Sequence, residues 1–243
     1  METLYKQVAA LISDQKECIA LTGAGISAES GIPTFRARGG LWEKYDPAVY
    51  ASIEVFQKDP SKYWSLRGDF IRNYNHYQPN KAHLALADLE GMGFLRCLIT
   101  QNIDGLHKKA GNREVIEIHG SLREIYCLRC GKEYVAPDIP HGNPPYCSCG
   151  GLLKPNTVLY GEQLPSEALS RAQHESNSCK IMLLIGTSAV TMPAAYLPFM
   201  AKENHAKVIE INIENAFRDA DYFIREKAGI ALPEIVKNVK QMK

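Results

Sequence analysis

Four cysteines in the middle of the sequence have the types and spacing of metal ligands. Two residues separate Cys127 from Cys130, and a single residue separates Cys147 from Cys149. Four thiolates suit tetrahedral zinc, and a site with four cysteine ligands is closed and structural rather than catalytic. Disulfides or unbonded thiols are the alternative, although clustering in a reducing compartment favours a metal. We therefore expect structural Zn²⁺ on these four cysteines, with a second pair one residue shorter than the usual spacing.

A glycine turn near the N-terminus is a second candidate site. The apolar run Cys18–Leu21 leads directly into Gly23 and Gly25. Glycine allows a sharp turn and lets a phosphate approach the backbone, and a helix that begins with Ser27 as its N-cap would add bare N–H groups. The sequence thus predicts a pyrophosphate site, with a plain tight turn as the alternative. Ala28 replaces the third glycine of the dehydrogenase fingerprint, which disfavours a hydride-transferring enzyme.

Polar side chains also follow two later apolar runs. Phe94–Thr100 leads into Asn102 and Asp104, and Val115–Ile118 leads into His119. The carboxyl ends of parallel strands meet at the sheet edge where ligands bind. An imidazole is the natural general base near neutral pH, and an amide and a carboxylate can orient a carboxamide or a ribose. The alternatives are a hydrogen-bonded histidine at a strand end and two turn-forming residues.

The apolar pattern predicts the scaffold that would position these residues. Strands alternate with helices, and several strands, such as Ile181–Ile185 and Lys207–Ile211, are almost continuously apolar. This pattern is typical of the α/β class with a doubly wound, Rossmann-like parallel sheet. The stretch from Ser121 to Pro155 is rich in Pro, Gly and Cys. It is too small to form its own hydrophobic core, which favours an insert that a metal ion stabilises.

These observations predict a division of the chain. We expect a Rossmann-like domain of residues 1–120 and 152–243 and a small zinc-binding domain of residues 121–151. Residues 38–92 would form a helical insertion. It would begin with a long loop that has one or two short helices and covers the glycine turn.

Composition limits the possible partners. The 243 residues carry a net charge of +1, which gives no sign of direct nucleic-acid binding or of attachment to a membrane surface. No apolar run reaches the roughly 18 residues of a spanning helix. The first residues mix acidic and basic side chains within a helical period, so they predict a first helix rather than a signal peptide. We expect a cytoplasmic protein.

Together these motifs resemble the sirtuins, the NAD-dependent protein-lysine deacylases. The resemblance covers nearly the whole chain in the order of the family. It rests on Gly23–Ser27, Gly31–Arg36, Gln101–Asp104, His119–Gly120, the four cysteines, Leu159–Glu162, Gly186–Ser188 and Asn212–Glu214.

The resemblance implies a reaction as well as a fold. The carbonyl oxygen of an acyl-lysine would displace nicotinamide from NAD, and His119 would then act as general base on a ribose hydroxyl. The products would be lysine, nicotinamide and O-acyl-ADP-ribose. His119 and Asn102 would be the catalytic residues, Asp104 would hold the carboxamide, Phe35 would shield the sugar, and Arg36 would support the phosphates.

The resemblance also implies two sets of binding residues. Those for NAD are Gly23, Ala24, Gly25, Ser27, Thr34, Phe35, Arg36, Trp42, Gln101, Asn102, Ile103, Asp104, Gly186, Thr187, Ser188, Asn212, Ile213, Glu214 and Ala228. Those for the acyl-lysine protein or peptide are Val158, Tyr160, Gly161, Glu162 and Val190. The peptide would pair as an added strand between Val158–Glu162 and Thr187–Met192.

One departure from the family bears on the acyl group. Thr34 stands where many deacetylases have aspartate, and the threonine form resembles a branch that includes desuccinylases and demalonylases. In that branch, a tyrosine and an arginine three residues later recognise an acidic acyl group. The corresponding positions of this chain are Arg67 and Phe70, so the pair is missing. We therefore expect deacetylation, or removal of another neutral acyl group. The alternatives are a desuccinylase or demalonylase and a non-catalytic module that binds acyl-lysine.

Overall fold

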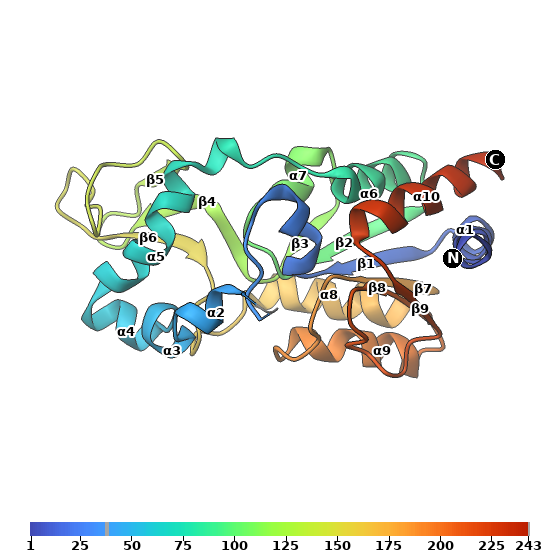
Figure 1. Ribbon diagram of the computed structural model, residues 1–243. Helices are drawn as coiled ribbons and strands as arrows, with labels where there is room; N and C mark the ends of the chain where they lie inside the picture. Colours follow the sequence, from blue (N-terminus) through green and yellow to red (C-terminus); the bar gives the residue numbers. More distant parts are fainter. Residues whose placement is uncertain (37–38, 243) are drawn as a thin grey trace.

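The computed structural model describes residues 1–36 and 39–242, and its centre is a six-stranded parallel sheet (Figure 1). The strand order is β3-β2-β1-β7-β8-β9. The strands are β1 (Cys18–Thr22), β2 (Leu95–Thr100), β3 (Val115–Glu117), β7 (Ile181–Ile185), β8 (Lys207–Asn212) and β9 (Tyr222–Arg225). The order reverses direction between β1 and β7, so this is the predicted doubly wound sheet.

Helices cover both faces of this sheet because its central strands are buried on both sides. Every residue of β1 and β7 is buried. On one face pack α1 (Glu2–Gln15), α6 (Lys81–Gly91) and α10 (Ala228–Gln241). On the other face pack α8 (Ser166–Ser178) and α9 (Leu197–Glu203), which follows the short turn η3 (Ala194–Tyr196) (Figure 1). The sequence did not predict α8, which is polar on its outer side.

A second sheet has the antiparallel order β5-β4-β6. Its strands are β4 (Gly120–Cys127), β5 (Glu133–Val135) and β6 (Leu153–Thr157). The last of these strands lies beyond the predicted boundary at residue 151, because the chain returns to pair with β4 before it rejoins the large sheet. The division of the chain into domains stays a prediction.

The helical insertion packs against this second sheet. Its helices are α2 (Leu41–Lys44), α3 (Pro47–Tyr50), α4 (Ile53–Lys58) and α5 (Pro60–Arg72). Three short helices therefore replace the predicted one or two, and Arg38, the predicted start of the insertion, lies outside the described residues. Trp64 of α5 is buried and donates to the carbonyl of Leu153 at 3.2 Å. This contact fixes α5 against β6.

Two further short helical segments follow α5 and β2. Helix α5 ends at Arg72, and the short 3₁₀ helix η2 (Tyr74–His76) follows it. Helix α7 (Leu106–Ala110) follows β2. Within residues 1–36 and 39–242, no helix is long and apolar enough to cross a membrane.

Candidate active site and metal centre

A cleft of about 1280 Å³ opens where the parallel strands end. Its walls include residues just beyond the ends of five strands, namely Gly23, Gln101, His119, Gly186 and Ile213. The opposite wall comes from the segment after β6 and from the helical insertion. The cleft therefore lies at the switch point of the large sheet and is closed by the second sheet.

Most of the predicted site residues line this cleft. From the predicted NAD set these are Gly23, Ala24, Gly25, Thr34, Phe35, Arg36, Trp42, Gln101, Asn102, Ile103, Gly186, Thr187, Ser188, Asn212, Ile213, Glu214 and Ala228. His119 also lines it, together with Val158, Tyr160, Gly161 and Glu162. Ser27, Asp104 and Val190 are outside this lining.

The glycine turn is built for close packing of two loops. A Cβ on Gly25 would lie 2.7 Å from the Cα of Gly186, and a Cβ on Gly23 would lie 2.9 Å from the Gly186 carbonyl oxygen. The N–H group of Gly23 donates to the carbonyl of Ile185 at the end of β7 at 3.0 Å, and that of Gly25 donates to the carbonyl of Gly186 at 2.8 Å. The N–H groups of Gly23 and Gly25 are therefore not bare, which contradicts this part of the predicted pyrophosphate site.

Ser27 has a different role from the predicted one. The 3₁₀ helix η1 (Ala24–Ser30) begins after Gly23, so Ser27 is inside it and is not its N-cap. Its hydroxyl donates to Asp104 Oδ2 at 2.7 Å and accepts from Asn102 Nδ2 at 3.1 Å. Asn102 also donates to the Gly23 carbonyl at 3.1 Å. This buried network ties the end of β2 to the glycine turn.

Asp104 is buried, and both of its carboxylate oxygens accept hydrogen bonds from the protein. Its second oxygen, Oδ1, accepts from the N–H of Leu106 at 2.9 Å. Burial raises the pKa of Asp104, and the bonds from Leu106 and Ser27 only partly oppose this shift. The carboxyl group therefore supports Ser27 from behind the cleft wall, and Ser27 in turn contacts Asn102.

His119 is held in one orientation by the chain after β2. Its Nδ1 lies 3.0 Å from the carbonyl oxygen of Gln101. A carbonyl only accepts, so Nδ1 carries the proton and a neutral ring keeps Nε2 as a free base. Burial lowers the pKa of His119; the bond to Gln101 opposes that shift, and the positive charge of Arg36 adds to it. The neutral, basic form is therefore favoured at neutral pH.

The far wall of the cleft is an aromatic cluster around a cation. The Phe35 and Trp42 rings stack with centroids 5.2 Å apart, and the guanidinium of Arg67 lies 5.3 Å from the Phe35 centroid. Arg36 donates to the Tyr160 hydroxyl at 3.1 Å. Among the described residues, no carboxylate pairs with Arg67, whose titratable neighbours are the Tyr63 and Tyr160 hydroxyls. The buried Trp42 Nε1 has no acceptor among them.

Arg67 and Phe70, which hold the places of the predicted acyl-selective pair, differ in whether they reach the cleft. Arg67 lines the cleft, whereas Phe70 stacks on Tyr77 with centroids 4.5 Å apart and is outside the lining. Arg72, one turn further along α5, pairs with Asp69 at 3.0 Å and is also outside it. The rotation of α5 decides this: with 3.6 residues per turn, Phe70 is turned about 60° from Arg67 around the helix axis, and the bond from Trp64 to Leu153 fixes the helix against β6.

A buried carboxylate holds the loop at the other end of the cleft. Glu210 of β8 is fully buried and accepts from the N–H groups of Ala216 at 2.7 Å and Phe217 at 3.2 Å. Asn212 donates to the Thr187 carbonyl at 2.8 Å. Glu210 is a functional residue that the sequence did not predict, although a charged residue inside an apolar strand is a signal for a buried anchor.

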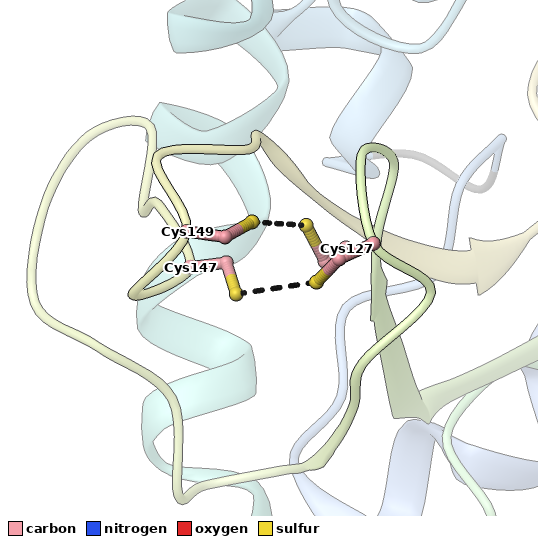
Figure 2. Close-up of side chains that lie close together, drawn as sticks. Cys127, Cys147 and Cys149 are labelled. Carbon is pink, nitrogen blue, oxygen red and sulfur yellow. Dashed lines mark hydrogen bonds between the residues drawn. The ribbon is translucent and has the colours of Figure 1, made fainter.

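The four predicted metal ligands form a compact cluster (Figure 2). All four sulfur atoms lie within 4.8 Å of one another, and the Cys127–Cys149 and Cys130–Cys147 pairs are 3.5 and 3.7 Å apart. Zn–S bonds of about 2.3 Å give a tetrahedral edge of about 3.8 Å, so the cluster fits zinc. All four cysteines are free of disulfides.

Two glycines let the shorter cysteine pair reach this geometry. Gly150 has a φ of 81°, which favours glycine, and its N–H donates to the Cys147 carbonyl at 2.8 Å. A Cβ on Gly151 would lie 2.5 Å from the Cys127 sulfur. The tight turn at Gly150–Gly151 thus compensates for the single residue between Cys147 and Cys149.

Comparison with known proteins agrees with this geometry. Residues 23–193 match the model of the Sir2 family. The chain belongs to the Sir2 family. This Sir2 chain is 46% identical over 240 residues to NAD-dependent protein deacylase 2 of Pyrobaculum aerophilum. The aligned region covers 96% of this chain and 95% of that protein.

Solved Sir2 structures have the same fold. A mutant Sir2 homologue in complex with ADP-ribose matches with a TM-score of 0.91 and 44% identity, over 97% of this chain and 96% of that one. A Sir2 protein with a deacetylated peptide and 3′-O-acetyl ADP-ribose matches with a TM-score of 0.90 and 34% identity, over 96% of this chain and 97% of that one.

Proposed function

We infer that this chain is an NAD-dependent protein deacylase. The observation that carries this conclusion is the orientation of His119, whose Nδ1 faces Gln101 and whose ring lines the cleft of a Sir2 chain. The cleft fits a dinucleotide, because it lies at the switch point of a doubly wound sheet and has Arg36 in its wall. Bound NAD supplies an activated sugar carbon, a nicotinamide leaving group and the final acceptor of the acyl group.

Different residues of the chain would transfer the proton, assist it and exclude water. His119 would take a proton at Nε2 from a ribose hydroxyl, since its other nitrogen is protonated and bonded to Gln101. Asn102 would act beside it, held by its bonds to Gly23 and Ser27. Phe35 and Trp42 would exclude water from the sugar.

The two binding sets are part of this proposal. The predicted NAD residues that line the cleft would contact NAD, and Ser27 and Asp104 would act through Asn102. Val158, Tyr160, Gly161, Glu162 and the more distant Val190 would receive an acyl-lysine protein or peptide. Acetyl or another neutral acyl group is the proposed substrate. A cytoplasmic location and the lack of a nucleic-acid partner stay predictions.

One observation favours a second candidate for the acyl group. Arg67 is half-buried in the cleft wall without a carboxylate partner among the described residues. Burial lowers the pKa of Arg67, although a guanidinium stays charged at neutral pH. A desolvated cation gains from pairing with an anion, so an acyl chain that ends in a carboxylate is the alternative.

The test is nicotinamide release from NAD with and without acetyl-lysine peptide. We expect the wild-type chain to release nicotinamide with the peptide and His119→Ala to lose about 100-fold or more of that rate. A chain that binds the peptide but releases no nicotinamide with acetyl- or succinyl-lysine peptides would be a binding module instead. A dehydrogenase would reveal itself by absorbance at the reduced-nicotinamide band.

A further inference from the structure

Lys154 is a charged side chain that the structure buries outside the cleft lining. It lies on β6 and is 6% exposed. Its Nζ lies 3.2 Å from Glu162 Oε2 and donates to the Thr157 carbonyl at 3.0 Å. It also lies 5.9 Å from the centre of the Tyr126 ring. Lysine is rarely buried unless paired, so the bond with Glu162 compensates for the lost hydration of Lys154.

Glu162 in turn closes a short turn that lines the cleft. Its Oε2 accepts from the N–H of Leu159 at 2.8 Å, and its own N–H donates to the Leu159 carbonyl at 2.9 Å. Gly161, inside this turn, has a φ of 89°. One carboxylate oxygen therefore contacts both Lys154 and the start of the turn, so the ammonium fixes the shape of Leu159–Glu162.

The backbone of Val158–Tyr160 is hydrogen-bonded to His119 and to the helical insertion. The N–H of Val158 donates to the His119 carbonyl at 2.9 Å. Tyr160 donates to the Ala51 carbonyl at 2.9 Å and accepts from Ile53 at 3.0 Å. Among the bonds of the described residues, none uses the N–H of Gly161. An incoming extended peptide therefore has an open donor at the turn that Glu162 closes.

We propose that Lys154 is a positioning residue for the substrate, which holds the turn Leu159–Glu162 in the shape that receives the acyl-lysine peptide. This inference rests on the proposed function. Lys154 itself is outside the cleft lining and lies on β6 of the second sheet, whereas the glycine turn follows β1 of the large sheet. Its loss should therefore weaken peptide binding and leave NAD binding unchanged.

The experiment compares Lys154→Met and Lys154→Arg in steady-state nicotinamide release. We expect Lys154→Met to raise the KM for acetyl-lysine peptide about tenfold, with the KM for NAD within about twofold of wild type. Lys154→Arg keeps a cation that can reach Glu162 and should restore the peptide KM to within about threefold of wild type. Because KM does not depend on the active fraction, a simple loss of folded protein would not mimic this result.

A matched control and a second variant complete the design. Lys207→Met removes a lysine that pairs with Asp221 at 2.9 Å away from the cleft, and it should leave both KM values unchanged. If Lys154→Met does not fold, Lys154→Gln replaces it with the same expected rise. An unchanged peptide KM, or an equal rise in both KM values, would overturn the proposal. If the wild type releases no nicotinamide, the Kd of a labelled acetyl-lysine peptide tests Lys154 separately from the deacylase function.

Discussion

The Nδ1 atom of His119 lies 3.0 Å from the carbonyl oxygen of Gln101, which follows the neighbouring strand β2. This bond assigns the proton of a neutral ring to Nδ1 and leaves Nε2 as the base. It also joins the ends of β2 and β3, so the base is held by two strands of a rigid sheet rather than by a mobile loop.

The pH dependence of the reaction should follow His119. Burial lowers its pKa below the ordinary value of about 6.5, so the neutral form persists to a lower pH than in a free histidine. We expect kcat/KM for the peptide to be constant around neutral pH and to fall with acid below about 6.5. A pH profile of nicotinamide release measures this. An acid limb centred above that value would contradict the proposed environment of His119.

Gly25→Ala should destabilise the protein. The added methyl group would lie 2.7 Å from the backbone of Gly186, which cannot move aside as a flexible side chain can. We expect a loss of about 1–3 kcal/mol in the free energy of unfolding, measured by urea denaturation. Gly91→Ala in α6 is the control, because its added Cβ has no neighbour within 4 Å. Equal stabilities of the two variants would show that the loops do not pack as described.

Removal of one cysteine ligand should release zinc. Hydrogen bonds from the Cys149 N–H and the Tyr134 hydroxyl lower the pKa of Cys147 to about 6, which favours its thiolate. We expect Cys147→Ser to lose most of one bound zinc per chain and to lower the Tm, whereas Ser148→Ala keeps both. Metal analysis and thermal unfolding measure the two effects. A full zinc content in Cys147→Ser would exclude this cysteine as a ligand.

Arg67→Leu should separate the two candidate acyl groups. If a neutral group is the substrate, the variant should keep kcat/KM for acetyl-lysine peptide within about threefold, since no charge pairs with the acyl chain. If an acidic group is the substrate, kcat/KM for succinyl-lysine peptide should fall by about 10- to 100-fold, which corresponds to loss of a charged hydrogen bond. Arg72→Leu on the same helix is the control, because Arg72 pairs with Asp69 outside the cleft.

The sequence by itself determined β1, β2, β3, β7 and β8 of the large sheet, the order of the motifs and the metal ligands. Runs such as Ile181–Ile185 are apolar because both faces of a parallel sheet are buried, and this signal is local. The cysteine spacing is also local, since short turns bring the sulfurs of each pair together. His119 and Asn102 could be placed at the cleft because strand ends meet at one edge of the sheet.

Only the tertiary structure decided which distant groups meet. Gly25 is glycine because Gly186 approaches it, and Ser27 bonds Asp104 rather than capping its own helix. Arg67 lines the cleft and Phe70 does not, because the packing of α5 against β6 sets its rotation. Lys154 is buried because Glu162 folds back over it. Each of these partners is chosen by long-range packing, whereas a sequence pattern reports only local backbone preference and burial.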